Sequence, residues 1–577
     1  MKSAMFKSLG VLLFVFAVGA MAPVSASAAE DEVPTFTKDI APIFQAKCEA
    51  CHRPGSIAPM SLVSYQEARP WARSIKERVV SRQMPPWHID RTVGITEFKN
   101  DRSLTDAQID TVVRWVDGGA PRGNPEDMPA AVDWPDESKW YFAEQFDGPP
   151  DLIVESTPYT VPAEATNAWW RPRVPTGLTE QRWARAIEAR PGTVAGRKVT
   201  HHAIARLVQE EPDAQLRAAN AANPVAGTGG DRSRGAGTFM EWAVGKTGEI
   251  MRPGSGKLMM PDSEIQWDIH YAAAGEEITD NVILGVYLYP EDSPPEHRQV
   301  LHLMGTGRMD IPPNSITMTE GFFPLQRAGR IESFQPHMHL RGTAMSMEAI
   351  LPTGRRQLLS HVGDFNFNWH NSYVYTDEAA PLLPKGTLIK VTAWYDNTAA
   401  NRSNPDPNVW VGSGSRTADE MGHAWVNVTY FDDEDYEAEV AKREAAEERL
   451  QALSKQRDDL GNRLQEAIRQ REEAAVLQKQ LEDKYQHVLH ERDAFAQRIR
   501  QLELESDAAP KPSPAKSGDD DDDDGDDAIT VFDEDGNPLD AAALAKEVEQ
   551  LRREVFNVYN RNRSLTKDLE DSKSAKL

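Results

Sequence analysis

The tryptophans divide this chain into a part that can bury a core and a part that cannot. All 14 lie between Trp71 and Trp425 of the 577 residues, and after Asp433 the composition shifts to Glu, Arg, Gln, Ala and Leu. Large aromatic side chains supply much of the apolar area that a domain buries. We therefore predict globular domains up to about residue 432, with room for roughly three or four, and an elongated helical tail beyond them.

The N-terminus has the pattern of an export signal. Lys2 and Lys7 precede an apolar run from Leu9 to Ala22, and Ala26-Ser27-Ala28 offers a small-residue cleavage site. This run is shorter than the ~20 residues that cross a bilayer, so a signal peptide over 1–28 is favoured over an anchor. We expect an exported protein, either periplasmic or at the cell surface or extracellular. The formal net charge of -26 argues against a nucleic-acid partner.

The first domain contains a covalent haem motif. Cys48-Glu49-Ala50-Cys51-His52 places two thiols and an iron-binding imidazole within five residues, and no other cysteine exists in the chain. Thr105 to Gln108 has the pattern of a helix cap, with apolar residues at helical spacing after it and Gly118-Gly119 ending the helix. We predict a small all-α c-type cytochrome domain over 30–122 with one haem c, followed by a linker over 123–150.

The sixth iron ligand has three candidates. The segment from Arg82 to Trp87 resembles the axial-methionine loop of small c-type cytochromes, which makes Met84 the first choice. Met60 and His88 remain alternatives, the latter giving iron with two histidine ligands.

The sequence of the middle of the chain predicts β-strands. Short alternating runs such as 285–289 and 388–392 are separated by clusters of Gly, Pro, Asn and Asp. A β stretch of this length predicts two all-β, jelly-roll-like sandwiches, over 151–305 and 306–432.

Histidines in this β region have the spacing of metal ligands. In a strand, alternate side chains share a face, so His337 and His339 form a two-nitrogen claw, while Phe334, Met338 and Leu340 face a core. A thioether added to two imidazoles favours copper, especially Cu(I). His201 and His202 are neighbours that point apart in a regular strand, so both can reach one ion only through a bulge or an irregular strand end.

Four motifs occur together in a specific order. They are His201-His202-Ala203-Ile204, Ile269-His270-Tyr271, His337-Met338-His339-Leu340 and Asp419-Glu420-Met421. This order resembles the copper type II, ascorbate-dependent monooxygenases, which include peptidylglycine α-hydroxylating monooxygenase and dopamine β-monooxygenase. The resemblance covers about residues 150 to 432.

The resemblance implies two β-sandwich domains that face each other across a solvent-filled cleft and bind two copper ions. One copper would be held by His201, His202 and His270 and would pass electrons. The other would be held by His337, His339 and Met421, the catalytic set, where oxygen and substrate react.

This chain departs from the peptide-amidating branch in three places. Gln335 stands where that branch has an arginine for the substrate carboxylate, and His423 and Trp425 replace an asparagine and a tyrosine. A glycine-extended peptide is therefore not the expected substrate, and Gln335 looks closer to the monoamine-hydroxylating branch. His423 could approach the second copper, whereas His297, His302, His361 and His370 are expected to be surface or core histidines.

The tail has a heptad pattern over 437–505. Its apolar core positions include Leu450, Leu453, Leu460, Leu464, Leu481, Tyr485, Val488, Phe495, Ile499 and Leu502. Arg457, Arg471, Gln478 and Arg492 interrupt them, so a single solvated helix is the alternative to a coiled coil. We predict a disordered acidic linker over 506–530 and a terminal helix over 541–573, with a homo-oligomer formed through the coiled coil.

Taken together, these patterns predict an exported copper-dependent monooxygenase that hydroxylates a C–H bond of a small organic substrate with O2. The haem would supply electrons from an external donor, which could be a cytochrome, a quinol-derived donor or an ascorbate-like reductant. The alternatives are a copper-binding electron-transfer protein without oxygenase activity and an interaction protein that acts through its tail.

Overall fold

The computed structural model describes residues 33–56, 58–134, 139–164, 168–214, 237–243 and 246–507, with short stretches beyond residue 530. The predicted signal peptide lies outside the described residues, as do positions 508–530 of the acidic linker and most of the predicted terminal helix. The chain divides into two compact units, Met1–Val440 and Ala441–Leu577. Within the described residues, no helix combines the length and apolar character that crossing a membrane requires.

The N-terminal region is helical, as predicted. An aromatic core formed by Phe36, Phe44, Tyr65 and Trp115 holds the helices together with ring centroids 5.6 to 6.4 Å apart. The cap predicted at Thr105 is present, because its hydroxyl accepts from the backbone of Gln108 and the Gln108 side chain accepts from the backbone of Thr105. The elements are η1 (Phe36–Ile40), α1 (Ala41–Lys47), α2 (Tyr65–Ala68), η2 (Arg69–Trp71), α3 (Ala72–Val80), α4 (Asp106–Asp117) and η3 (Pro125–Asp127).

One segment of this region packs elsewhere. Trp87 and Phe98 are buried in the core of the second β-sandwich, where Trp87 lies 4.7 Å from the ring of Tyr373 and Phe98 lies 5.4 Å from that of Tyr375. A further bridge pairs Ile89 with Val362. Apolar composition alone predicts that such residues are buried, but not in which core.

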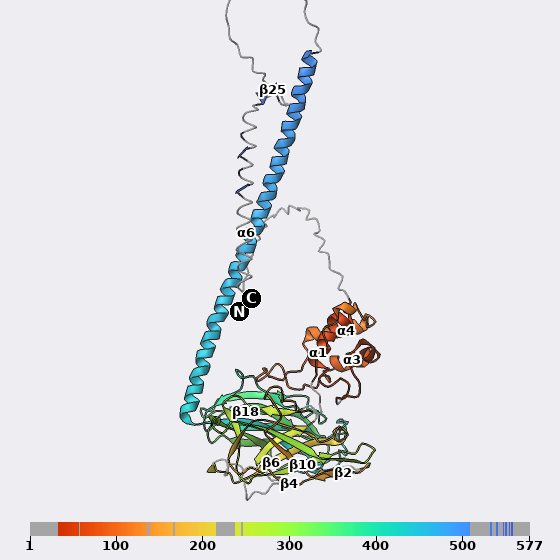
Figure 1. Cartoon of the computed structure of the whole chain (residues 1–577), viewed down its shortest axis with the longest axis vertical. Helices are drawn as coiled ribbons and strands as arrows, with labels where there is room; N and C mark the ends of the chain where they lie inside the picture. Colours follow the sequence, from red (N-terminus) through yellow and green to blue (C-terminus); the bar gives the residue numbers. More distant parts are fainter. Residues whose placement is uncertain are drawn as a thin grey trace, which may run out of the picture. The chain divides into compact units, whose positions relative to one another are not determined.

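The first sandwich places two sheets around one core that includes Ile187, Phe239, Ile269 and Val286. One sheet has the order β1–β12–β5–β9, and the other has β7–β6–β10–β3. The paired strands β6 and β10 of the latter are labelled side by side in Figure 1. The strands are β1 (Leu152–Glu155), β2 (Tyr159–Val161), β3 (Ala168–Trp170), β4 (Arg173–Pro175), β5 (Arg182–Pro191), β6 (Thr200–Val208), β7 (Gly237–Ala243), β8 (Gly248–Ile250), β9 (Ser255–Met259), β10 (Glu264–Tyr271), β11 (Ile278–Asp280) and β12 (Val282–Leu288), with the short helix η4 (Gly196–Lys198) before β6.

The second sandwich packs a sheet of order β15–β22–β18–β19 against strands that pair with β24. Phe334, Met345, Val391 and Val426 are among the side chains between them. The strands are β13 (His297–Thr306), β14 (Asp310–Ile311), β15 (Ile316–Pro324), β16 (Ala328–Ile331), β17 (Ser333–His337), β18 (Gly342–Ile350), β19 (Arg356–Val362), β20 (Tyr373–Val374), β21 (Leu382–Leu383), β22 (Leu388–Asp396), β23 (Val411–Gly412) and β24 (Gly422–Phe431).

The two sandwiches share strand β13. It pairs with β24 from Arg298 to Thr306, and it also pairs with β9 and β7 of the first sandwich. The boundary predicted at residue 305 therefore falls inside a strand. Ile204, Leu301, Leu303 and Trp425 form a buried apolar cluster across the contact. The sandwiches thus touch directly beside the candidate metal residues.

A buried histidine of β13 makes stability depend on pH. His302 is 2% exposed, with its Nε2 atom 2.8 Å from the Tyr430 hydroxyl. Burial, helped by Arg298 and Arg327, lowers the pKa of His302 to about 3. An unfolded histidine titrates near pH 6.5, so between these values the unfolded chain binds one more proton than the folded chain. Stability must therefore fall as the pH falls through this window.

We expect a His302→Phe variant to lose less stability on acidification. Each pH unit inside the window costs about 1.4 kcal/mol, so between about pH 6 and 4.5 the loss should be about 2 kcal/mol smaller than in the wild type. Urea unfolding at the two pH values measures this difference. Tyr430→Phe keeps the imidazole and should keep the wild-type pH dependence; equal losses in His302→Phe and the wild type would contradict the assignment.

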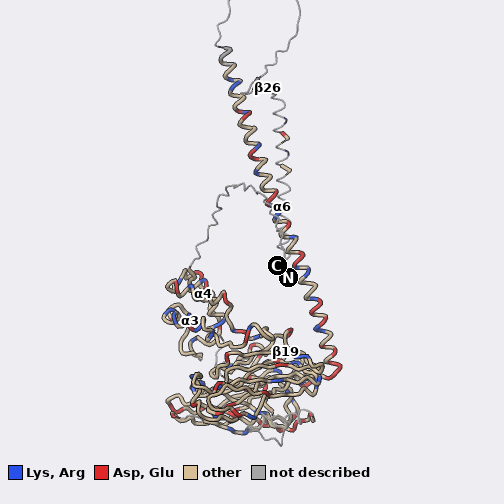
Figure 2. Tube along the Cα trace, turned by 180° about the vertical axis from the view of Figure 1, so that it is seen from behind, with Lys and Arg blue, Asp and Glu red and all other residues tan. Residues whose placement is uncertain are grey.

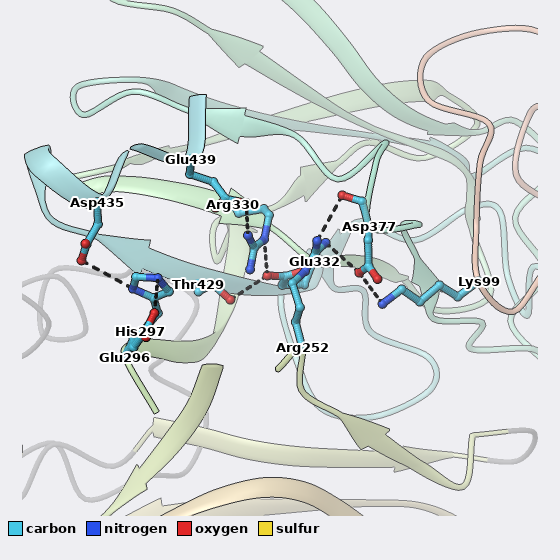
Figure 3. Close-up of polar contacts among 10 residues, drawn as sticks. All are labelled: Lys99, Arg252, Glu296, His297, Arg330, Glu332, Asp377, Thr429, Asp435 and Glu439. Atoms are coloured by element: carbon cyan, nitrogen blue, oxygen red, sulfur yellow. Dashed lines mark hydrogen bonds and ion pairs between the residues drawn. The ribbon is translucent and has the colours of Figure 1, made fainter. Parts of the chain in front are cut away.

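A polar network ties the start of the long helix to the second sandwich (Figure 3). Arg330 donates to Glu332 at 2.8 Å and to Glu439 at 3.1 Å. Glu332 also pairs with Arg252 at 3.4 Å, and Arg252 pairs with Asp377 at 3.0 Å. Because Glu439 lies in the first turns of the helix, this network fixes where the helix leaves the β structure.

The predicted tail helix is confirmed as α6 (Asp433–Asp507), a single helix of 75 residues. Acidic residues in its first turn suit the positive end of the helix dipole. Charges of both signs alternate along it, with pairs such as Arg469 to Glu466 and Glu473 (Figure 2). Leu450 and Leu453, which belong to the predicted heptad seam, are 68% and 56% exposed in the single chain. A coiled-coil partner for them stays a prediction.

Candidate metal centres

Three histidines of the first sandwich converge. The ligand nitrogens of His201, His202 and His270 lie within 4.8 Å of one another. The bulge that the sequence requires is present, because His270 pairs with His202 while Tyr271 pairs with Thr200, which leaves His201 as the extra residue in β6. This irregularity turns two neighbouring side chains toward the same point.

The chemistry of this set fits a metal ion. The Nδ1 atoms of His201 and His202 are buried and have no hydrogen-bond partner among the described residues. Burial lowers the pKa of His202 well below its usual range and that of His270 to about 4, and the neighbouring imidazoles add to both shifts. All three rings are therefore neutral near pH 7, the form in which histidine binds metals.

The second set is organised around the end of β17. The rings of His337 and His339 lie 5.3 Å apart, and the predicted core-facing residues Phe334 and Met338 are fully buried. His339 holds its Nδ1 atom 3.0 Å from the carbonyl oxygen of Asp419. A histidine anchored in this way at one nitrogen presents the other to a metal.

Glu420 connects this strand end to the loop that carries Met421. Its carboxylate accepts from the backbone N–H groups of His339 and Arg341 at 2.8 and 2.6 Å. Burial raises the pKa of Glu420 to about 7 despite these donors. No role for Glu420 followed from the sequence, although this residue stands directly before the predicted ligand Met421. These hydrogen bonds join the segment that precedes Met421 to the chain segment that carries His339.

Both sets open into a single pocket. Its lining includes His202 and His270 from the first sandwich and His337, His339 and Met421 from the second. The space is about 600 Å³, including its open mouth. The rings of His202 and His337 lie only 6.4 Å apart. Side chains of the two sets therefore line one pocket where the two sandwiches meet.

Two further histidines belong to this cluster. His423 is the cross-strand neighbour of His337, with their rings 5.0 Å apart, and it lines the pocket, as the sequence had suggested. His370 was expected to be an ordinary histidine, yet its Nδ1 atom lies 3.1 Å from that of His337. Its Nε2 atom is buried without a hydrogen-bond partner among the described residues. No spacing rule could have identified His370, because it lies in a loop 33 residues from its partner.

Gln335 does not line the pocket. It is 1% exposed, donates to Glu241 at 2.6 Å and accepts from Lys246 at 3.2 Å. This buried contact links β17 to the first sandwich. The likeness of Gln335 to the monoamine-hydroxylating branch therefore gives no information about what the pocket binds.

The haem motif forms a compact turn after α1. The backbone N–H of Cys51 donates to the carbonyl of Cys48 at 3.1 Å, and that of His52 donates to it at 2.9 Å. The Nδ1 atom of His52 lies 3.2 Å from the carbonyl oxygen of Met60. This contact engages Nδ1 of His52, so Nε2 is the nitrogen that could bind a metal. Met84 is half-buried in the turn after α3, and the backbone N–H of His88 donates to the Tyr373 hydroxyl at 3.3 Å, on the second sandwich.

Comparison with known proteins does not identify this chain. No family model matches it, and no curated protein does. Similar solved structures include the infectious bursal disease virus VP2 subviral particle, with 10% identity over 53% of this chain and 75% of that chain and a TM-score of 0.14. The Gx strain of the same virus matches with 8% identity over 51% and 77% of the two chains and a TM-score of 0.13. A structure of oxalate decarboxylase matches with 7% identity over 54% and 87% and a TM-score of 0.09. These scores carry no argument about fold or function.

Proposed function

We propose that the protein is a copper-dependent monooxygenase that inserts one oxygen atom of O2 into a C–H bond of a small organic molecule. The reaction consumes two electrons and two protons and releases the second oxygen atom as water. The observation that carries the proposal is the convergence of four motifs, spread from His201 to Met421, on one pocket. Residues so far apart in sequence have no structural need to meet there as five metal-binding side chains.

The two donor sets suit two copper ions with different tasks. Three imidazoles from His201, His202 and His270 accept both Cu(I) and Cu(II), whereas the thioether of Met421 beside His337 and His339 favours Cu(I). When bound, these ions would supply oxygen activation and one-electron storage. The protein supplies the rest: it keeps the imidazoles neutral through burial, it orients His339 through Asp419, and it fixes Met421 through Glu420.

His370 has a defined part in this arrangement. A hydrogen bond between two neutral imidazoles needs a proton on only one of the facing nitrogens. If His337 binds an ion through Nε2, its Nδ1 carries that proton and donates to His370 across the observed 3.1 Å. His370 thereby holds His337 in the tautomer that ligates metal.

We further propose that Cys48 and Cys51 carry a covalent haem with His52 as its iron ligand, which makes 30–122 a c-type cytochrome domain. The haem would supply electrons one at a time. The contact between the Met60 carbonyl and Nδ1 of His52 supports Met84 as the sixth ligand, because it places the Met60 backbone at the Nδ1 end of the ring, opposite the Nε2 atom that would bind iron. We keep His88 as the alternative.

A Met421→Ala variant tests this function. Changes around a metal site cost about 10–100-fold in affinity or activity, so loss of a ligand should lower product formation at least about 100-fold. Copper-loaded protein is given a reductant, 18O2 and a panel of small aromatic acids, amines and amides, and mass spectrometry detects products with one labelled oxygen.

The haem absorption spectrum of Met421→Ala should match that of the wild type, and Met318→Ala, at a methionine 54% exposed on β15, should keep full activity. Retained turnover in Met421→Ala would remove this residue from the site. Copper-dependent haem reoxidation without any labelled product would instead favour the electron-transfer alternative.

A further inference from the structure

One wall of the metal pocket is formed by two arginines and one aspartate. Arg171, Arg206 and Asp268 all line the pocket with His202 and His270. Arg171 donates from Nε to one carboxylate oxygen of Asp268, and Arg206 lies 3.4 Å from the other. Both oxygens of Asp268 are thus engaged by guanidinium groups.

The charge of this wall is positive. Asp268 is the single acidic residue among the described residues that line the pocket, and it faces two guanidinium groups. No carboxylate remains to bind an ammonium group, so the wall is unsuited to an amine. One positive charge remains uncompensated.

The guanidinium group of Arg171 is positioned to bind an anionic ligand. Its guanidinium lies 4.8 Å from the ring centroid of Trp169, and Trp169 stacks on His270 with centroids 4.6 Å apart. Its side chain is 46% exposed, whereas that of Arg206 is 7% exposed. Within the described part of the chain, no hydrogen bond or ion pair engages the two terminal nitrogens of Arg171. A planar pair of N–H donors in fixed orientation matches a carboxylate.

The remaining lining is suited to an apolar body. It consists of aromatic and aliphatic side chains with two hydroxyl groups at one side, namely Trp169, Phe367, Trp425, Ile204, Leu303, Ser415 and Thr417. Pockets of this composition bind a flat apolar group and use a few polar groups for orientation.

We propose that the pocket binds a small aromatic carboxylic acid, with its carboxylate on the terminal nitrogens of Arg171. The proposal rests on the proposed function in that this acid would be the substrate class of the same site. This substrate class differs from those of the peptide-amidating and monoamine-hydroxylating branches. The acid would be bound by Arg171 of the first sandwich and not by the residue at position 335.

Three phenyl compounds of similar size and different charge test this inference. Phenylacetate, phenylacetamide and phenethylamine carry charges of about −1, 0 and +1 at neutral pH. Calorimetric titration of the full chain is carried out with and without copper, since a carboxylate could also bind copper directly. Phenylacetate should bind roughly tenfold or more tightly than the other two in both states, because hydrogen bonds to charged groups are the stronger class. Equal affinities, or tighter binding of the amine, would overturn the proposal.

Variants at one position locate the interaction. Arg171→Gln should weaken phenylacetate binding roughly tenfold and leave phenylacetamide unchanged, while Arg171→Lys should retain part of the preference. The matched control is Arg173→Gln, because Arg173 lies on the next strand, outside the pocket lining, and bonds Gln266 at 3.1 Å. Unchanged binding in Arg171→Gln would also refute the assignment. Since binding is measured without oxygen or turnover, failure here leaves the oxygenase test intact, and failure of that test leaves this one intact.

Discussion

We expect the wild type to bind two copper ions per chain and a His337→Ala variant to bind one. In the proposed second site His337 would be one of three donors, and His339 and Met421 alone would give an incomplete site. The His201, His202 and His270 set has its own three nitrogens within 4.8 Å of one another and should keep its ion. Because even outer contacts of a metal site are worth about 10–100-fold in affinity, loss of this ligand should weaken the second site by at least about 100-fold.

Copper titration with EPR detection measures this change, and stopped-flow spectroscopy follows reoxidation of the reduced haem by oxygen in the same samples. The wild type should reoxidise faster with copper than without it, and His337→Ala should lose most of that acceleration. His361→Ala is the control, since His361 contacts Trp394 at a ring distance of 5.9 Å and does not line the pocket. Two tightly bound ions in His337→Ala would contradict the assignment, and the double variant with His370→Ala would then show whether His370 replaces the lost ligand.

An Arg330→Ala variant is expected to destabilise the β structure by about 2–3 kcal/mol, the range of a lost hydrogen bond to a charged group. Arg330 is 3% exposed and pairs with both Glu332 and Glu439. Without Arg330, the buried Glu332 carboxylate loses its guanidinium partner at 2.8 Å and keeps only the more distant Arg252 at 3.4 Å. A buried charge that loses part of its compensation destabilises the folded state. Thr429, which also donates to Glu332 at 2.7 Å, cannot replace a charge.

Chemical denaturation followed by tryptophan fluorescence reports this loss, since all tryptophans lie before α6. Arg356→Ala is the matched control: its guanidinium pairs with Glu348 but is 58% exposed, and exposed pairs contribute about 0–1 kcal/mol. Similar stabilities of the two variants would show that the network in Figure 3 carries little of the folding energy.

Several features of the chain follow from local pattern alone. The capping residues predict where α4 begins, and the composition change at residue 433 predicts α6. Strand alternation predicts that Phe334 and Met338 face the core while His337 and His339 face away from it. The adjacent pair His201-His202 even predicts the bulge in β6. These predictions succeed because backbone geometry sets side-chain direction over a few residues, whatever the surrounding fold.

Contacts between residues that lie far apart in the sequence were determined only by the tertiary structure. His370 meets His337, Glu420 binds the backbone of His339 and Arg341, and Gln335 turns to Glu241 instead of the pocket. Likewise, Trp87 and Phe98 leave the helical region for the core of the second sandwich. Burial of apolar surface is favourable for any contact of the right shape, and a hydrogen bond forms with any suitable group within reach. The sequence therefore does not reveal which distant residue a given side chain will contact. The order of the motifs predicts which residues could bind metal, and only the packing of two sandwiches through β13 places them in one pocket.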